Sequence, residues 1–278
     1  MSQVYLNGDY LPLHDAKIPV LDRGFLFGDG VYEVIPAYQG RLFRLTEHLH
    51  RLQQSLNGIR LANPHSHEQW RQLLEPLLSA GHDQSIYLQI TRGVAAKRDH
   101  AFPAQVQPTV FAMASPITPY ADKDHGVGAI TLPDTRWGLC HIKAITLLAN
   151  ILLRQQAIDA GCAEALLLKN GTVTEGAASN VFIVDQGALI TPPKSADILP
   201  GITRDLILEI AEREHLSYHE AKIPEPQLRA AEEIWVTSST REILPIVTLD
   251  GVTVGEGRPG PLWQRMHTLF QAYKQHAS

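Results

Sequence analysis

The sequence predicts an α+β fold of two domains, in which mixed or antiparallel sheets are combined with helices. The chain has 278 residues, which corresponds to about two domains at roughly 150 residues each. Two-residue turns such as Asn7-Gly8 and Asn170-Gly171 recur between short apolar segments, as they do in β-hairpins. These hairpin signals outnumber βαβ patterns, which disfavours an all-parallel, doubly wound sheet.

The N-terminal part is expected to hold hairpin strands and two helices. Thr46 is the expected N-cap of the first helix, which has apolar side chains at helical spacing. Ser66 and Gln69 form a capping-box pattern at the start of the second helix. Two strands should follow, at residues 86–90 and 110–114.

A segment rich in proline, polar and charged residues, 115–126, interrupts the sequence. We therefore expect a smaller N-terminal α/β domain at 1–118, a linker at 119–126 and a larger C-terminal domain at 127–278. In the larger domain a helix is expected at residues 144–160 and is closed by glycine. Its other expected elements cover residues 127–132, 163–169, 172–175, 181–184, 188–191, 202–214, 234–237 and 262–273.

The charge balance disfavours several classes of partner. Lys and Arg number 24 against 29 Asp and Glu, for a net charge of −5, whereas nucleic acids and membrane surfaces favour basic proteins. Cys140 and Cys162 are too few for a disulfide framework, indicate a reducing compartment and are expected to be buried packing residues. No signal peptide or membrane span is evident. A cytoplasmic enzyme is the expectation.

Two motifs are expected to carry no function. The segment 255–260 matches the dinucleotide-binding pattern G-x-G-x-x-G, but too few residues follow it for a βαβ unit, so we expect a surface loop. His48 and His50 lie two residues apart on a helix and therefore face different sides. Together with His65 and His67 we interpret them as solvated side chains, and we expect no metal site.

Lys143 has an unusual setting among the eight lysines. It stands between Ile142 and the apolar run at residues 144–153. Desolvation disfavours an ammonium group, and a lowered pKa is what a Schiff-base lysine needs. A lysine that extends from a helix end toward solvent is an equally good interpretation of this local pattern.

Three further segments can bind charged groups. Residues 199–204 form a Pro-Gly turn that opens a helix, where free N–H groups favour a phosphate. Residues 237–240 are four consecutive hydroxyl side chains after a strand. Glu175 ends a strand, where its carboxylate can point into a cleft. An ordinary capped helix, a strand-end loop and a turn residue are the alternative interpretations.

Six segments, at residues 28–33, 47–52, 141–143, 174–180, 199–204 and 237–243, occur in this order. Together they resemble the class IV, or fold-type IV, pyridoxal-phosphate aminotransferases. That family includes branched-chain and D-amino-acid aminotransferases and aminodeoxychorismate lyases. The resemblance covers nearly the whole chain and implies a two-domain fold with pyridoxal 5'-phosphate (PLP) in the cleft between the domains, and a homodimer.

The resemblance also implies roles for individual residues. Lys143 would be the Schiff-base lysine and the proton shuttle. Glu175 would face the pyridine nitrogen and keep it protonated, which makes the ring an electron sink. The phosphate would be held by Arg51, Ile202, Thr203, Ser238 and Ser239, which together offer one cation with hydroxyl and amide donors.

Within that family, the segment Arg98-Asp99-His100 resembles the R-x-H element of the D-amino-acid aminotransferases. There the arginine and histidine, with the tyrosine at Tyr32, would bind the substrate α-carboxylate. We therefore expect amino transfer between a D-amino acid, such as D-alanine or D-glutamate, and a 2-oxo acid. Ala177-Ala178 replace hydroxyl residues often seen in that group, which leaves the substrate preference open. A branched-chain or (R)-amine aminotransferase, an aminodeoxychorismate lyase and a binding or regulatory protein without turnover remain the alternatives.

Overall fold

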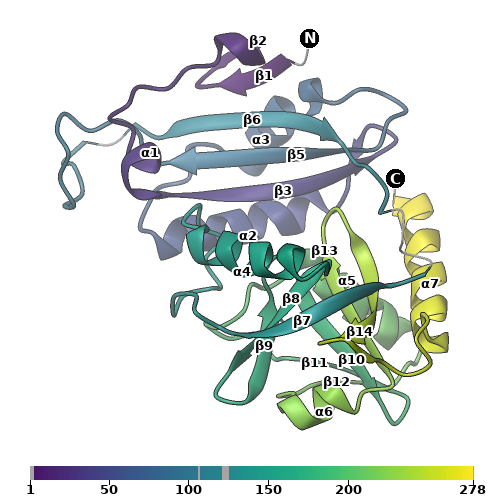
Figure 1. Ribbon diagram of the computed structural model, residues 1–278. Coiled ribbons are helices and arrows are strands. Elements are labelled where there is room, and N and C mark those ends of the chain that lie inside the picture. The colour runs from purple at the N-terminus through teal and green to yellow at the C-terminus, as the bar shows by residue number, and fades with distance from the viewer. Residues whose placement is uncertain (1–2, 106, 121–124, 278) are drawn as a thin grey trace. The chain divides into compact units, whose positions relative to one another are not determined.

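The structure is a computed structural model that describes residues 3–105, 107–120 and 125–277 (Figure 1). The chain forms two compact units. Unit 1 comprises Met1–Thr118 and Ile142–Leu147, and unit 2 comprises Pro119–His141 and Leu148–Ala277. The segment 142–147, which the sequence analysis assigned to the C-terminal domain, thus packs with unit 1. Residues 121–124 of the expected linker lie outside the described residues, so that linker stays a prediction.

Unit 1 contains an antiparallel sheet in the strand order β2-β1-β6-β5-β3-β4. Both residues of Asn7-Gly8 have positive φ angles, so this predicted hairpin turn is confirmed. Gln39-Gly40, between β3 and β4, also has two positive φ angles. The strands are β1 (Gln3–Leu6), β2 (Asp9–Pro12), β3 (Gly30–Tyr38), β4 (Arg41–Leu42), β5 (Gln84–Thr91) and β6 (Thr109–Pro116).

The helices of unit 1 are α1 (Arg23–Phe27), α2 (Leu45–Gly58) and α3 (His67–Leu74), with short 3-10 turns at Leu13–Asp15 and Glu75–Leu77. The capping box of α3 is confirmed, because Ser66 and Gln69 exchange side-chain and backbone hydrogen bonds. The predicted cap of α2 is wrong. Thr46 lies inside the first turn, and Arg44 takes the N-cap position with a φ angle of 53°. Arg44 pairs with Glu47 at 3.0 Å, and that carboxylate is favourable in the first turn of a helix.

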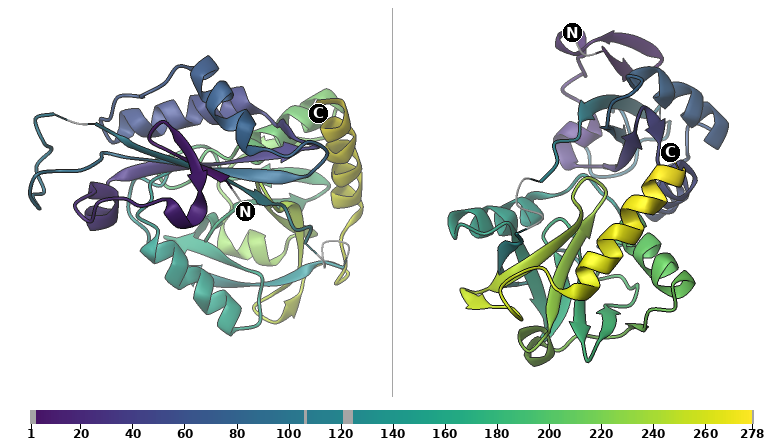
Figure 2. Two further views of the ribbon diagram at one scale, coloured as in Figure 1. Left: turned by 90° about the horizontal axis from the view of Figure 1, so that it is seen from above. Right: turned by 90° about the vertical axis from the view of Figure 1, so that its right-hand side faces the viewer.

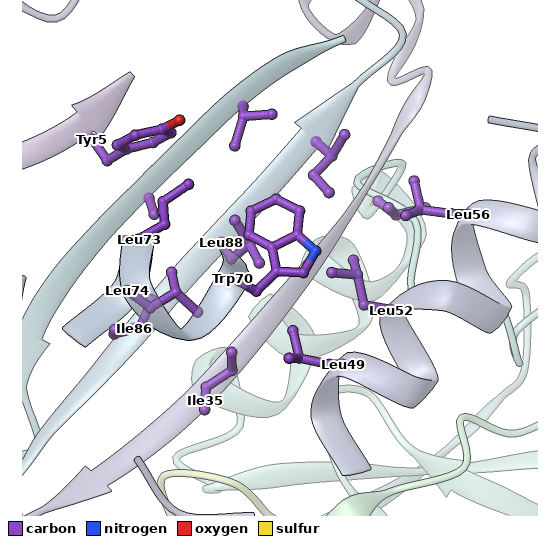
Figure 3. Packing of buried hydrophobic residues seen from close by; sticks show 14 of the residues in the cluster. Tyr5, Ile35, Leu49, Leu52, Leu56, Trp70, Leu73, Leu74, Ile86 and Leu88 are labelled. Atoms are coloured by element: carbon purple, nitrogen blue, oxygen red, sulfur yellow. The ribbon is translucent and has the colours of Figure 1, made fainter. Parts of the chain in front are cut away.

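The core of unit 1 lies between the sheet and the two longer helices, which cover one face of it (Figures 2 and 3). Leu49 and Leu52 of α2 and Trp70 of α3 pack over apolar side chains of β3 and β5. Trp70 has no exposed surface, and its indole N–H is bonded to the Asn63 side chain at 3.0 Å. This packing makes β3 and α2 a rigid support for the residues described below.

Unit 2 contains a mixed sheet in the order β12-β11-β10-β13-β14-β7-β8-β9, with β15 beside β14. The pairs β11–β12, β14–β7 and β7–β8 are parallel, and the other pairs are antiparallel. The predicted α+β class with mixed and antiparallel sheets is thus confirmed. The strands are β7 (Val127–Pro133), β8 (Glu164–Lys169), β9 (Thr172–Gly176), β10 (Asn180–Asp185), β11 (Ala188–Thr191), β12 (Tyr218–Glu220), β13 (Glu233–Ser238), β14 (Glu242–Leu249) and β15 (Val252–Thr253).

The helices of unit 2 are α4 (Leu148–Asp159), α5 (Ile202–Arg213), α6 (Glu225–Arg229) and α7 (Pro261–Ala277). α5 and α7 lie side by side (Figure 2, right). The helix predicted at residues 144–160 starts too early, since α4 begins at Leu148. Ala144 instead forms a β-bridge with Val31, which keeps this part of the chain extended. No helix in the described part of the chain could span a membrane.

The glycine-rich segment 255–260 is a largely exposed loop, as predicted, although a helix follows it. The buried carboxylate of Glu233 accepts the backbone N–H groups of Leu262 and Trp263 at 2.9 Å. A β-carbon on Gly260 would lie 2.2 Å from this carboxylate, so glycine is needed for its approach. The N-terminus of α7 therefore already has its anion, and it does not bind a cofactor phosphate.

Candidate active site

Lys143 lies in the segment of unit 1 that precedes α4. Its backbone carbonyl accepts the N–H of Tyr32 at 2.9 Å, and its own N–H donates to Ser55 Oγ of α2 at 3.1 Å. Its Nζ lies 4.1 Å from the centre of the Tyr32 ring. The neighbours Ile142 and Ala144 are buried. Lys143 is therefore held between β3 and α2, and the alternative of a lysine at a helix end is wrong because α4 starts five residues later.

A buried ionic cluster connects β3 with α2 in the same unit. The carboxylate of Glu33 has no exposed surface and accepts two hydrogen bonds from Arg51, at 2.8 and 2.7 Å. His48 Nδ1 lies 2.8 Å from the same carboxylate. Burial alone would raise the pKa of Glu33, but the Arg51 guanidinium and His48 lower it to about 2. Burial lowers the pKa of His48, although Glu33 opposes this.

This cluster corrects one expectation and adds residues that the sequence analysis missed. His48 is not solvated, whereas His50 and His67 are exposed and His65 is half-buried. His48 and Arg51 stand three residues apart on α2 and therefore share a face. That spacing, together with an acidic residue in an otherwise apolar strand, was the sequence pattern that could have indicated this buried ionic cluster. Glu33 fixes the orientation of the Arg51 guanidinium.

The three residues expected to bind the substrate carboxylate also lie in unit 1. Arg98 and His100 are exposed, and both contact Phe27 of α1, with the Arg98 Cζ at 5.0 Å from its ring centre and the His100 ring at 5.3 Å. Tyr32 lies instead beside Lys143 and Tyr87. Among the described residues no hydrogen bond or ring contact joins Tyr32 to Arg98 or His100.

Glu175 of unit 2 stands near the end of β9 and is buried. Its carboxylate accepts hydrogen bonds from Arg136, from the Asn180 amide at 3.1 Å and from the Leu199 N–H at 3.0 Å. Burial raises the pKa of Glu175 to about 7, although Arg136 and the Leu199 N–H oppose the rise. A further cation beside this carboxylate would therefore favour its ionised form.

Arg136 and Asp134 support Glu175 and were missed by the sequence analysis. Asp134 accepts Arg136 Nε at 2.9 Å and Nη2 at 2.7 Å, and it also accepts the Thr174 hydroxyl at 2.7 Å. The two residues follow β7, which is distant from Glu175 in sequence. An acidic residue two positions before an arginine at a strand end was the only signal. The guanidinium of Arg136 thus spans two carboxylates.

The turn before α5 packs against the Asn180 side chain. The Asn180 amide donates to the Leu199 carbonyl at 2.8 Å, and a β-carbon on Gly201 would lie 1.9 Å from Asn180 Oδ1. Gly201 is the N-cap of α5 and provides no side-chain cap. The first N–H groups of this helix, at Ile202 and Thr203, are therefore available to an anion.

The end of β13 supplies a second set of donors. Ser238 and Ser239 are half-buried there. Thr237 pairs with Asn180 across the sheet, so the two side chains share a face. The buried hydroxyl of Thr237 has no hydrogen-bond partner among the described residues. This hydroxyl shares a face with Asn180, which approaches Gly201 at the start of α5, so it can donate a hydrogen bond to a phosphate group held there.

Unit 1 thus presents a lysine amine and a buried arginine. Unit 2 by itself presents a buried carboxylate and anion-binding donors, which are groups that suit a phosphorylated cofactor with a basic ring. The chain belongs to the class IV aminotransferases, because the family model described as "Amino-transferase class IV" matches residues 30–249. The protein is thus an enzyme that transfers amino groups, and the alternative of a binding protein without turnover is no longer favoured.

Individual relatives agree with this assignment. The chain is 39% identical to a D-alanine aminotransferase of Staphylococcus haemolyticus over 100% of both chains. It is 39% identical to a D-alanine aminotransferase of Bacillus licheniformis over 97% of this chain and 96% of the relative. Among solved structures, the branched-chain amino acid aminotransferase of Escherichia coli matches with a TM-score of 0.90 and 28% identity, over 98% of this chain and 94% of that one.

Proposed function

We propose that the protein is a PLP-dependent D-amino-acid aminotransferase, which moves the amino group of a D-amino acid, such as D-alanine or D-glutamate, to a 2-oxo acid. The observation that carries the proposal is full-length identity of 39% to D-alanine aminotransferases, against 28% to the branched-chain structure. The segment Arg98-Asp99-His100 supports the same choice. A branched-chain enzyme is the second candidate because of that structural similarity.

Glu175, Lys143 and a set of phosphate-binding residues would hold the cofactor. When bound, PLP with a protonated ring withdraws electrons from the substrate Cα and so makes its proton acidic. Glu175 would hold the proton at the ring nitrogen, because a protonated ring beside this buried carboxylate would favour its ionised form. Lys143 would bind the cofactor through its Nζ. The phosphate would be held by Arg51, Ile202, Thr203, Ser238 and Ser239.

Lys143 would also carry the proton at the substrate Cα. Its backbone is bonded on both sides, to Tyr32 and Ser55, so only the side chain has to move. The Nζ would take the proton from Cα and return it to the cofactor carbon. Glu33 would keep the Arg51 guanidinium in position, so that the phosphate stays in place during this transfer.

Arg98, His100 and Tyr32 would recognise the α-carboxylate. A planar guanidinium can hold a carboxylate through two hydrogen bonds. Among the described residues Arg98 has no hydrogen-bond partner, so its N–H groups are available. Fixing the carboxylate determines which face of Cα meets the lysine, and thereby which enantiomer reacts.

We also propose a cytoplasmic homodimer. The free cysteines Cys140, which is buried, and Cys162, which is half-buried, fit a reducing compartment. The outer face of α4 is apolar and exposed, which is typical of a protein interface, and a second copy of the chain can cover it symmetrically. Light scattering during size-exclusion chromatography tests this, and Ile151→Glu should shift the protein toward monomer. The exposed side chains are Leu148, Ile151, Leu152 and Ile158.

The deciding experiment is a half-reaction with the purified holoenzyme. D-alanine, D-glutamate, L-leucine and (R)-1-phenylethylamine are mixed with it separately, and the absorbance of the bound cofactor is followed. We expect the D-amino acids to react fastest. Arg98→Ala should then slow D-alanine by about ten- to a hundredfold and the carboxylate-free amine much less. A fast reaction with L-leucine alone would favour the branched-chain enzyme instead.

A further inference from the structure

A buried arginine outside the site residues holds the backbone of the Arg98–His100 loop. Arg23, the first residue of α1, is 3% exposed. Its Nη1 donates to the carbonyl oxygens of Asp99 at 2.6 Å and Ala101 at 3.2 Å, and its Nη2 donates to that of His100 at 3.2 Å. One guanidinium thus binds three consecutive carbonyls, in a loop whose side chains are exposed.

Asp29 connects this arginine to the strand that carries Tyr32. Its Oδ2 accepts Arg23 Nε at 2.8 Å and Arg92 Nε at 2.8 Å. Burial alone would raise the pKa of Asp29, but hydrogen bonds from Arg92 and Arg23 lower it, so the carboxylate is ionised at neutral pH. Asp29 directly precedes β3. The loop backbone is therefore tied, through Arg23 and Asp29, to the start of β3.

The other end of α1 contacts the side chains of the same loop. Phe27 stands four residues after Arg23, and its ring centre lies 4.9 Å from the Arg23 Cζ. The same ring lies 5.0 Å from the Arg98 Cζ and 5.3 Å from the His100 ring. Contact through a ring face leaves the N–H groups of a guanidinium available to a ligand.

We propose that α1 is a positioning element for substrate recognition: Arg23, anchored by Asp29, fixes the loop backbone, and Phe27 orients the Arg98 and His100 side chains toward the α-carboxylate of the substrate. The proposal rests on the proposed function, which assigns that carboxylate to Arg98 and His100. An exposed loop that has to be ordered on binding lowers affinity, whereas a loop ordered in advance does not. Arg23 and Phe27 are positioning residues and touch no substrate.

The test is a double-variant comparison on the holoenzyme. Arg23→Lys keeps the positive charge but cannot span three carbonyls and a carboxylate. In the half-reaction with D-alanine, we expect its apparent Kd to rise about tenfold, while the rate at saturation stays near wild type. In an Arg98→Ala background, Arg23→Lys should raise the apparent Kd for D-alanine little further, because its effect on binding depends on the Arg98 side chain. Equal losses in both backgrounds would overturn the proposal.

Trypsin cleavage tests the loop without any substrate. Lys97 and Arg98 are exposed, and mass spectrometry identifies cleavage after either residue. Arg23→Lys should speed that cleavage about tenfold. The control is Ile86→Val, which lowers the stability of the hydrophobic core of unit 1, where Ile86 pairs with Ile35 and Ala114 across the sheet. Equal cleavage of both variants would show general destabilisation and overturn the proposal.

Phe27 provides a second series in case Arg23→Lys folds poorly. Phe27→Leu should raise the apparent Kd for D-alanine, and Phe27→Tyr, which keeps the ring, should restore it. A wild-type Kd in Phe27→Leu and Arg23→Lys, together with a large loss in Arg98→Ala, would overturn only the positioning role. No loss in Arg98→Ala would instead refute the proposed function itself, whatever the trypsin result.

Discussion

Replacing Glu33 with glutamine should destabilise unit 1 strongly and in a pH-dependent way. The carboxylate has no exposed surface and accepts hydrogen bonds from Arg51 at 2.8 and 2.7 Å, with His48 at 2.8 Å. Glu33→Gln keeps the shape but removes the charge. The Arg51 guanidinium is then left buried without its counterion, which is the costly way to break such a pair.

The magnitude follows from the pKa. The Glu33 carboxyl titrates at about 2 in the folded protein, against an ordinary value of 4.5. At about 1.4 kcal/mol per pKa unit, ionised Glu33 stabilises the folded state by about 3 kcal/mol at neutral pH. Because the folded pKa is the lower one, this contribution is present above pH 4.5 and is lost as the pH falls toward 2. Removing one partner of a buried ion pair typically lowers the free energy of unfolding by about 3–5 kcal/mol, which agrees with this figure.

The assay is urea unfolding followed by circular dichroism between pH 7 and pH 3. At pH 7 we expect Glu33→Gln to lower the free energy of unfolding by about 3–5 kcal/mol. The difference in the free energy of unfolding between Glu33→Gln and wild type should be about 2 kcal/mol smaller at pH 3. At that pH the wild-type protein loses most of the stabilisation that ionised Glu33 provides. The control is Glu47→Gln, whose side chain is 41% exposed in its pair with Arg44, and this variant should stay within about 0.5 kcal/mol of wild type.

Two results would refute this reasoning. A loss below about 1 kcal/mol at pH 7 would mean that Glu33 is not the counterion of Arg51. If the difference in the free energy of unfolding between variant and wild type does not change between pH 7 and pH 3, the folded-state pKa of Glu33 is ordinary. If the reasoning holds, Glu33→Gln should also release the cofactor more readily, since Arg51 would no longer be fixed.

Three further substitutions test the site. Lys143→Ala should keep the fold, seen by circular dichroism, and lose transamination; near-normal turnover with a borohydride-trapped adduct at another lysine would contradict its role. Glu175→Gln should retain cofactor but lose activity by about tenfold for each pKa unit of ring basicity, and a wild-type kcat would rule that role out. Gly201→Ala would place a methyl group 1.9 Å from Asn180 Oδ1, so we expect a loss of about 1–3 kcal/mol in thermal unfolding, and an unchanged Tm would show that the turn can yield.

Features that depend only on neighbouring residues could be predicted from the amino-acid sequence. The turns Asn7-Gly8 and Asn170-Gly171 adopt positive φ angles because asparagine and glycine tolerate the left-handed region. The capping box at Ser66 formed because both of its hydrogen bonds close within three residues. The order of six short motifs was sufficient to identify the family, because each motif is local and their order along the chain does not depend on how the side chains pack.

Features that depend on residues distant in sequence became evident only in the folded structure. Helical periodicity predicted a helix from residue 144, but a bridge from Ala144 to Val31 keeps the chain extended past Lys143. His48 looked like a surface residue until Glu33 paired with it. Arg23 binds carbonyls more than 70 residues away, and nothing in its neighbours indicates this. A buried charged group pairs with a residue that the fold places within about 3 Å of it. The spacing of residues along the sequence does not indicate which residue that is.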